Sequence, residues 1–546
     1  MTLDARDQSL TTGQTKVVLA SSLGTVFEWY DFYLYGSLAS IIAKQFFSGL
    51  NPTGAFIFAL LAFAAGFAVR PFGALVFGRL GDLVGRKHTF LVTIIIMGAS
   101  TFLVGVLPSY EKVGVIAPVA LIALRLLQGL ALGGEYGGAA TYVAEHAPHG
   151  KRGLHTSFIQ TTATLGLFLS LLVILACRSW FGADAFDRNG WRVPFLVSAV
   201  LLAISVWIRL QLNESPLFLQ MKAEGKQSQA PLRESFLSKN SRVVVLALFG
   251  ATAGQAVVWY CGQFYALFFL TQILKVDATP ANLLIAGALA IGTPFFVLFG
   301  WLSDKIGRKP VVMAGCLIAA LTYFPIFHGL TWYGNRALAE ASAASPVSVA
   351  SNLQDCSFQF NPIGTKQFTT SCDVAKSTLA NRGIPYENVT APAGTRATIH
   401  VGQVVVASYE RGVASSAVEG KRFDTELKAA LLNAGYPDKS DSAKLNVPML
   451  LLLLSILVVY VAMVYGPIAA WLVELFPTRI RYTSMSLPYH IGNGWFGGFL
   501  PTTAFALVAT TGNIYQGLWY PIVVAAVTVV VGSLFLPETR HVDISK

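Results

Sequence analysis

The chain is dominated by long apolar runs that are separated by short polar turns. Twelve of these runs reach about 20 residues, the length that a helix needs to cross the hydrocarbon core of a bilayer. The pattern predicts an all-α polytopic membrane protein with twelve transmembrane helices. The runs lie near residues 17–43, 54–77, 89–108, 113–143, 154–180, 191–212, 243–272, 281–301, 310–330, 447–473, 483–510 and 517–537.

Two longer polar segments interrupt this pattern. Residues 213–242 are polar, Ser-rich and basic, and we expect them to form a cytoplasmic linker between an N-terminal six-helix bundle, 1–212, and a C-terminal one, 243–546. Residues 331–446 follow the ninth run and should therefore lie outside. Helical patterns at 373–382 and 424–433, with a strand or hairpin arm at 397–409, predict a small α/β extracytoplasmic insertion between helices 9 and 10.

A repeated decapeptide indicates that the two bundles are related. GRLGDLVGRK at 78–87 and GWLSDKIGRK at 300–309 match at six of ten positions and lie 222 residues apart. The glycines allow close backbone approach, the Asp can face the positive end of a neighbouring helix, and the basic pair suits a cytoplasmic surface. The motif residues are Gly78, Asp82, Gly85, Arg86 and Lys87 in the first copy and Gly300, Asp304, Gly307, Arg308 and Lys309 in the second.

These turns resemble the signature loops of the major facilitator superfamily. Further stretches resemble its metabolite:proton symporter branch, which includes permeases for shikimate, 2-oxoglutarate, citrate and proline/betaine: FEWYDFYLYG at 27–36, RPFGALVFGRLGD at 70–82, RLLQGLALGGEYGGA at 125–139 and VELFPTRIRYTSMSLPYHIGNG at 473–494. The resemblance implies a two-bundle transporter of small organic solutes driven by the proton gradient. It also implies that Asp82 and Asp304 brace the outward-facing state. Leu83, where the family usually has a base, and the long insertion depart from the family pattern.

Composition and charge agree with a membrane protein. Of 546 residues, 54% are hydrophobic and 12% charged, and the net charge is +11. No basic stripe with interleaved aromatics points to nucleic acid. Most Lys and Arg of the short loops fall on one side, which predicts cytoplasmic termini. With the family resemblance, we expect a multi-pass, monomeric protein of the bacterial inner membrane.

Charged residues inside the apolar runs are the first candidates for function, because a charge at mid-bilayer costs about 2.5 to 3.5 kcal/mol on insertion scales. We hypothesise that Asp31 or Glu28 carries a proton and that its protonation is coupled to Arg125, which would also meet a substrate carboxylate. A fixed ion pair that only orders the bundle is the alternative. The candidates are Glu28, Asp31 and Tyr35 on the first run and Arg125, Gln128 and Glu135 on the fourth.

The second half offers a possible cavity wall on its first run. Gln255, Trp259 and Gln263 share one helical face and Tyr260 is adjacent, although aromatic stripes more often serve packing. His490 and Asn493 lie one turn apart on the eleventh run, where a structural His is the more common case than a proton relay.

Two further features remain open at this stage. We expect Arg70 to snorkel or to pair with an acid rather than to touch substrate. Cys356 and Cys372 share the outer insertion, where they form a disulfide or stay free thiols.

The predicted function is proton-coupled import of a small, carboxylate-bearing metabolite by alternating access. The alternatives are a proton antiporter that exports drugs or metabolites and a receptor that senses through its outer insertion. We find no nucleotide loop, metal-ligand spacing or nucleophile arrangement, so the sequence predicts no enzyme, no metal site and no cofactor beyond the proton gradient. The expected partners are a small organic solute, protons and the lipid bilayer, with no nucleic acid.

Overall fold

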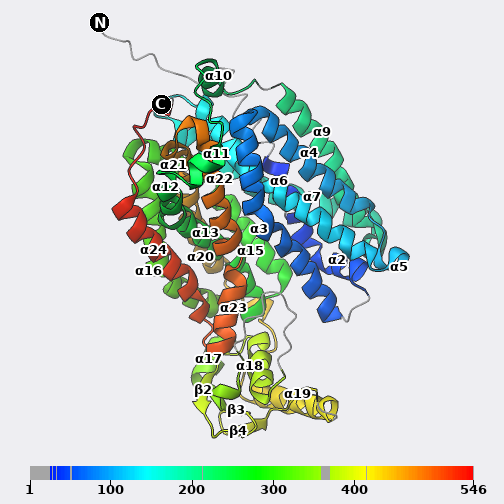
Figure 1. Cartoon of the computed structure of the whole chain (residues 1–546). Coiled ribbons are helices and arrows are strands. Elements are labelled where there is room, and N and C mark those ends of the chain that lie inside the picture. The colour runs from blue at the N-terminus through cyan, green and yellow to red at the C-terminus, as the bar shows by residue number, and fades with distance from the viewer. Residues whose placement is uncertain are drawn as a thin grey trace.

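The computed structural model describes residues 22, 25–27, 29–31, 33–48, 52–211, 213–357, 369–412 and 415–544. Long helices form one tall bundle, and a small mixed module lies at one end of it (Figure 1). The two decapeptides lie at the opposite end. We call these the module end and the motif end.

Nine helical segments within the described ranges are long and apolar enough to cross a membrane. The uninterrupted long helices are α3 (Pro52–Leu83), α4 (Arg86–Val106), α6 (Ile116–His146), α7 (Arg152–Phe181), α9 (Arg192–Leu210), α15 (Ala278–Ile306), α16 (Arg308–Gly334) and α24 (Trp519–Phe535). Three composite segments follow one another piece by piece: α12 (Asn240–Ala247), α13 (Ala253–Tyr260) and α14 (Ala266–Phe268); α20 (Val447–Tyr465) and α21 (Ile468–Leu475); and α22 (Arg481–Ile491) and α23 (Leu500–Thr511). The nine segments counted above do not include α3 or the segment formed by α22 and α23. The remaining short helices are α2 (Ala39–Phe46), α5 (Tyr110–Val113), α8 (Ala183–Ala185), α10 (Pro216–Ala223) and α11 (Pro231–Phe236).

These helices follow the predicted apolar runs, so the all-α membrane fold is confirmed. The first run, 17–43, is described only in part. Within the linker 213–242, α10 and α11 begin at Pro216 and Pro231, because proline is pre-organised for the first helical turn. Side chains such as Leu172, Leu175, Trp207 and Leu321 are exposed on the outer helix faces, as expected for surfaces that contact lipid rather than water.

Glycines on α6 set the packing of the N-terminal half. A Cβ at Gly129 would collide with the backbone of Gly66, and one at Gly133 would collide with the backbone of Arg70 and Gly73. These small residues therefore let α6 and α3 approach at backbone distance. This close packing fixes which face of α3 turns toward the other half of the protein.

The module is the predicted α/β insertion, with slightly different limits. Because α16 continues to Gly334 and α20 begins at Val447, the module occupies 335–446 rather than 331–446. It contains α17 (Arg336–Ala344), β1 (Val347–Ser351), α18 (Ser371–Arg382), β2 (Glu387–Thr390), β3 (Thr398–Val401), β4 (Val404–Ala407) and α19 (Ser416–Asn433). The two expected helices and the hairpin are present, whereas α17, β1 and β2 were not predicted.

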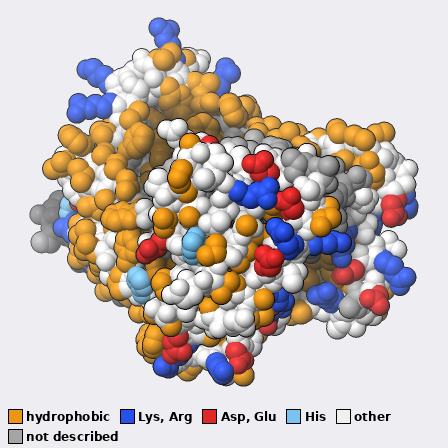
Figure 2. All heavy atoms as spheres, turned by 90° about the horizontal axis from the view of Figure 1, so that it is seen from below, with side chains coloured by type: hydrophobic (Ala, Val, Ile, Leu, Met, Phe, Trp, Pro, Cys, Tyr) orange, Lys and Arg blue, Asp and Glu red, His pale blue; other side chains and the backbone are white. Residues whose placement is uncertain are grey.

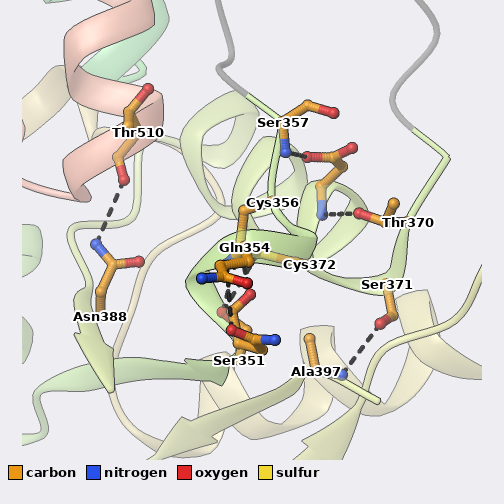
Figure 3. The surroundings of a disulfide bond; sticks show 12 residues. Ser351, Gln354, Cys356, Ser357, Thr370, Ser371, Cys372, Asn388, Ala397 and Thr510 are labelled. Carbon is orange, nitrogen blue, oxygen red and sulfur yellow. Dashed lines mark hydrogen bonds between the residues drawn. A yellow bond between two sulfur atoms is a disulfide. The ribbon is translucent and has the colours of Figure 1, made fainter. Parts of the chain in front are cut away.

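The strands form one sheet in the order β2-β1-β3-β4. Strand β1 pairs parallel with β2 and antiparallel with β3, and β3 pairs antiparallel with β4. Cys356 and Cys372 form a disulfide that ties the segment after β1 to the start of α18 (Figure 3). Charged side chains gather on the module and hydrophobic ones on the surrounding bundle when the protein is seen from the module end (Figure 2).

The module docks on the C-terminal half. The Asn388 side chain donates hydrogen bonds to the carbonyls of Thr510 and Thr511 at the end of α23 (Figure 3). Lys275, which follows the first span of that half, donates to the Asn381 carbonyl at 2.6 Å. One hydrophobic cluster contains residues of both the module and this bundle, for example Ile399 and Leu457. The module is therefore an extension of the C-terminal half.

Candidate functional site

A narrow central cavity lies where the two halves face each other. Helices from both halves contribute to its wall, so a ligand there would contact both at once. It is lined by Thr25, Trp29, Arg70, Tyr136, Ile159 and Gln160 from the first half and by Trp259, Tyr260, Tyr465, Tyr489, His490 and Asn493 from the second.

Aromatic pairs that cross between the halves narrow this cavity. The rings of Trp29 and Trp259 lie 5.3 Å apart between centroids, and those of Tyr136 and Tyr489 stack in parallel at 3.6 Å. The Tyr489 hydroxyl also lies 2.7 Å from that of Tyr465. A solute that enters the cavity must separate these pairs, and its presence would therefore affect the contact between the halves.

Arg70 is placed differently from the sequence-based expectation. It lines the cavity, and its guanidinium carbon lies 4.4 Å from the centroid of the Phe67 ring one turn earlier on α3. Its Nε atom is buried without a hydrogen-bond partner. No acidic side chain in the described part of the chain forms an ion pair with it. Of the two expectations for Arg70, pairing with an acid is therefore not found among the described residues, whereas snorkelling stays a prediction.

His490 and Trp259 add further polar atoms to the same wall. Both ring nitrogens of His490 and the Nε1 atom of Trp259 are buried and lack a hydrogen-bond partner among the described residues. The expected structural histidine, satisfied by its neighbours, is thus not what the structure shows. The Asn493 side chain is engaged, since it exchanges hydrogen bonds with Gln255 at 3.0 and 3.3 Å.

Only some of the other predicted site residues of the second half line the cavity. Trp259 and Tyr260 line the cavity, as the hypothesis of a cavity wall requires, and His490 and Asn493 of the eleventh run line it as well. Gln255 and Gln263 are buried outside this lining. The helical turn that follows Tyr260, Cys261–Tyr265, is of the π type. Such turns rotate the succeeding side chains relative to a regular helix, so the strict spacing of the sequence pattern is not maintained.

A second polar cluster is buried inside the N-terminal half. Arg125 donates to Gln128 at 2.6 Å and lies 3.4 Å from an Asp31 carboxylate oxygen, to which Gln128 also donates at 2.7 Å. The Arg125 guanidinium carbon stacks 3.6 Å from the centroid of the Tyr35 ring, and Gln128 donates to Thr101. Four of the predicted site residues therefore lie together, away from the central cavity: Asp31, Tyr35, Arg125 and Gln128.

Within this cluster several polar atoms remain without partners. One carboxylate oxygen of Asp31 and two guanidinium nitrogens of Arg125 are buried and unbonded. The contact between the two groups is consequently a loose ion pair held together by Gln128. Glu28, the other acid predicted for this role, lies outside the described residues.

Glu135 is fully buried and pairs with Arg209 on α9 at 2.8 Å. The Arg209 guanidinium also stacks 3.6 Å from the Phe90 ring centroid and donates to the Phe90 carbonyl. This arrangement joins three helices of the N-terminal half. Glu135 does not line the cavity, so its geometry matches a bundle-ordering ion pair better than a substrate contact.

The motif end joins the halves through two symmetry-related aspartates. The Asp82 carboxylate accepts hydrogen bonds from the backbone amides of Tyr482 and Thr483 in the first turn of α22. The Asp304 carboxylate accepts from the amides of Gly153 and Leu154 in the first turn of α7. Each acid therefore faces the positive end of a helix from the opposite half, as predicted.

Buried ion pairs reinforce this junction. Arg481 pairs with Glu145 at 2.8 Å and Arg152 pairs with Glu474 at 3.4 Å, and each pair crosses between the halves. Arg308 also reaches Glu474 at 3.1 Å. Because the pairs are buried, removing one partner would leave an uncompensated charge.

Two glutamates at this end were missed by the sequence reasoning. Glu214 accepts from the amides of Arg86 and Lys87, and Glu538 accepts in the same way from those of Arg308 and Lys309. The signal was the Glu that follows the last span of each half, in NESPLF and LPETR.

The glycines before these capped helices have a clear role. Gly85 and Gly307 adopt φ values of 136° and 113°, which side chains rarely tolerate, and a Cβ at either would strike the capping carboxylate.

Two bundles of membrane-length helices around a shared cavity define the class of polytopic membrane transporters. Residues 16–242 match the family model "Sugar (and other) transporter". The chain is 39% identical over 333 residues to the inner membrane metabolite transport protein YhjE of Escherichia coli, which covers 60% of this chain and 74% of that protein. It is 34% identical to the shikimate transporter of E. coli, with 58% of this chain and 72% of that protein covered.

The fold is similar to the proton:xylose symporter XylE, solved with 6-bromo-6-deoxy-D-glucose, with a TM-score of 0.61, 16% identity and 98% of both chains covered. The chain therefore belongs to the major facilitator superfamily and is a multi-pass metabolite transporter, not an enzyme.

Proposed function

We propose that the protein is a proton-coupled symporter that imports a small, carboxylate-bearing metabolite by alternating access. The observation that carries the proton coupling is the buried pair of Asp31 and Arg125, with its unbonded oxygen and nitrogens. A permanently charged pair buried in the bundle is costly, and an acid in such a position can bind and release a proton as its partner moves. The relationship to metabolite transporters supports the solute class.

In this proposal the Asp31 cluster and the central cavity act together through the helices that carry them. Arg125 lies on α6, which packs at backbone distance on α3, the helix of Arg70. Protonation of Asp31 weakens its hold on Arg125 and frees the guanidinium for its other neighbours. A resulting shift of α6 also moves the cavity wall on α3, because the glycine contacts leave no free space between the two helices.

The motif end is the gate that faces the cytoplasm in this proposal. Asp82, Asp304 and the Arg481–Glu145 and Arg152–Glu474 pairs hold the halves together there. Opening toward the cytoplasm requires these contacts to separate while the halves rock about the cavity. The termini are then cytoplasmic, and the module at 335–446 lies outside, in accord with the distribution of basic residues.

Uptake into proteoliposomes tests the proposal. Purified protein is reconstituted, and labelled shikimate, 2-oxoglutarate and glycine betaine are offered with and without an acidic outer buffer. We expect one acid to accumulate above its outer concentration only when the proton gradient is present. The Asp31→Asn variant should lose this accumulation and keep exchange of labelled for unlabelled solute, since exchange needs no net proton movement.

Asp277→Asn is the matched control, because Asp277 forms an exposed ion pair with Lys439 at the module end. This control should retain accumulation. Gradient-driven efflux of preloaded solute would instead support the antiporter alternative. Undiminished accumulation by Asp31→Asn would contradict the assignment of Asp31 as the proton carrier.

A further inference from the structure

The polar groups of the central cavity differ from those elsewhere in the described membrane region. All six arginines that the structure buries pair with a carboxylate: Arg86, Arg125, Arg152, Arg209, Arg308 and Arg481. Arg70 is half-buried, lines the cavity and has no such partner among the described residues. The half-buried Arg192 also lacks a carboxylate, but it donates hydrogen bonds to the carbonyls of Gly105 and Leu107, whereas no hydrogen bond compensates the Arg70 Nε atom. A cation inside a bilayer protein is costly unless an anion or water compensates it. Its position therefore indicates a site for an anion that enters from solution.

The rest of the lining contributes hydrogen-bond donors and apolar surface. The Nε1 atom of Trp259 can only donate, and it has no partner among the described residues. His490 has two unbonded ring nitrogens, and it lines the same small cavity as Arg70 and Tyr260. Unmade hydrogen bonds of this kind around one cavity point to a ligand rich in acceptor oxygens.

We propose that Arg70 is the substrate-carboxylate anchor and that the substrate is a compact monocarboxylate with hydroxyl or carbonyl oxygens that bind His490 and Trp259. This inference rests on the proposed transport function and moves the carboxylate contact away from Arg125. Arg125 is occupied by Asp31, Gln128 and Tyr35 and does not line the cavity.

The charges in the cavity wall favour one class of substrate. Among its described lining residues Arg70 is the one permanent cation, and no Asp or Glu is present. One cation balances one carboxylate, so a second or third carboxylate would be buried without compensation. A quaternary ammonium would find aromatic rings but no acid, and it would be repelled by Arg70. The several aromatic rings favour a substrate whose body has an apolar or planar face.

Binding measurements on the detergent-purified full chain test this inference without requiring a proton gradient. Labelled shikimate is the probe, and its methyl ester, 2-oxoglutarate and glycine betaine are competitors. The wild type should prefer shikimate over its ester by about 10- to 100-fold, the range expected for a hydrogen-bonded charge. In Arg70→Gln this preference should fall to about one, while ester binding changes little.

Two companion variants keep the result interpretable. Arg70→Lys retains the charge but not the forked geometry, and we expect it to retain part of the preference for the acid. Phe67→Leu removes the ring beside Arg70 and leaves the cation, so it should retain the full preference. Each variant is first compared with wild type by gel filtration to show that it is folded.

The outcomes separate this inference from the proposed function. If Arg70→Gln weakens the acid and the ester equally, Arg70 does not contact the carboxylate and the inference is overturned. Stronger binding of 2-oxoglutarate or glycine betaine than of shikimate, or no binding of shikimate, overturns the substrate class. Arg70-dependent binding of shikimate in a protein that shows no gradient-driven uptake supports the inference and contradicts the proton coupling.

Discussion

The contact of Asp304 with α7 gives a sharp prediction about the gate at the motif end. Its two carboxylate oxygens accept hydrogen bonds from the amides of Gly153 and Leu154 at 2.9 and 2.8 Å, across the junction of the halves. The Asp304→Asn variant loses the negative charge and keeps only one acceptor oxygen, and its NH₂ group faces an amide donor. A hydrogen bond to a charged group contributes about 1.5 to 3 kcal/mol, and a charge at a helix N-terminus adds about 0.3 to 1 kcal/mol.

We therefore expect the variant to destabilise the closed motif end by about 2 to 4 kcal/mol relative to the open one. This free energy corresponds to a shift of about 30- to 1,000-fold in the equilibrium between the two states. Asp304 also pairs with Arg308 at 2.6 Å, but Arg308 keeps its contact with Glu474 and its charge stays compensated, so the variant should still fold. The predicted change is in conformation rather than in global stability.

Distance measurements between two spin labels test this prediction. Arg79 and Arg479 are exposed at the motif end on opposite halves, and each can be replaced by a labelled Cys in a background whose three free cysteines are removed. The wild type should give one short distance, and Asp304→Asn should add a longer one. Asp277→Asn, which alters an exposed ion pair, should match the wild type. An unchanged distance distribution in folded Asp304→Asn would refute the reasoning.

Three further changes probe the packing, the module and the helix caps. Gly133→Leu places a side chain against the α3 backbone at Arg70, so we expect little monodisperse protein by gel filtration, whereas Gly36→Leu, at a position with open space and no positive φ, should purify normally. Replacing Cys356 and Cys372 by Ser should destabilise the module by about 2 to 4 kcal/mol and speed its proteolysis; equal proteolysis rates would contradict this. Glu214→Gln should lower the thermal unfolding temperature because it weakens the cap on α4; an unchanged temperature would show that the cap is dispensable.

Much of the architecture could be predicted because it depends on local properties of the sequence. The length and the apolar character of each run decide whether a helix can span a bilayer, and neither property depends on distant parts of the chain. The repeated decapeptide revealed the two halves, and Asp82 and Asp304 do face helix ends of the opposite half. Helical spacing likewise grouped Asp31 with Tyr35 and Arg125 with Gln128, and the structure joins all four.

The position of Arg70 is the point at which the sequence was insufficient. Periodicity shows which residues share a face of α3, but the direction of that face depends on the rotation of the helix against its neighbours. Close contact of α3 with the glycines of α6 sets this rotation, and it places Arg70 in the cavity. A similar limit applied to Gln255 and Gln263, because π-type turns in their span shift the faces away from regular spacing.

The sequence by itself thus determined the membrane spans, the related halves, the extra module and the buried charges. Only the tertiary structure decided which of these charges are paired and which face the cavity. The physical reason is that a buried charge is defined by its partner, and the partners here come from segments hundreds of residues apart, as with Arg481 and Glu145. Sequence spacing alone places residues on the same helix face, whereas packing brings different helices together.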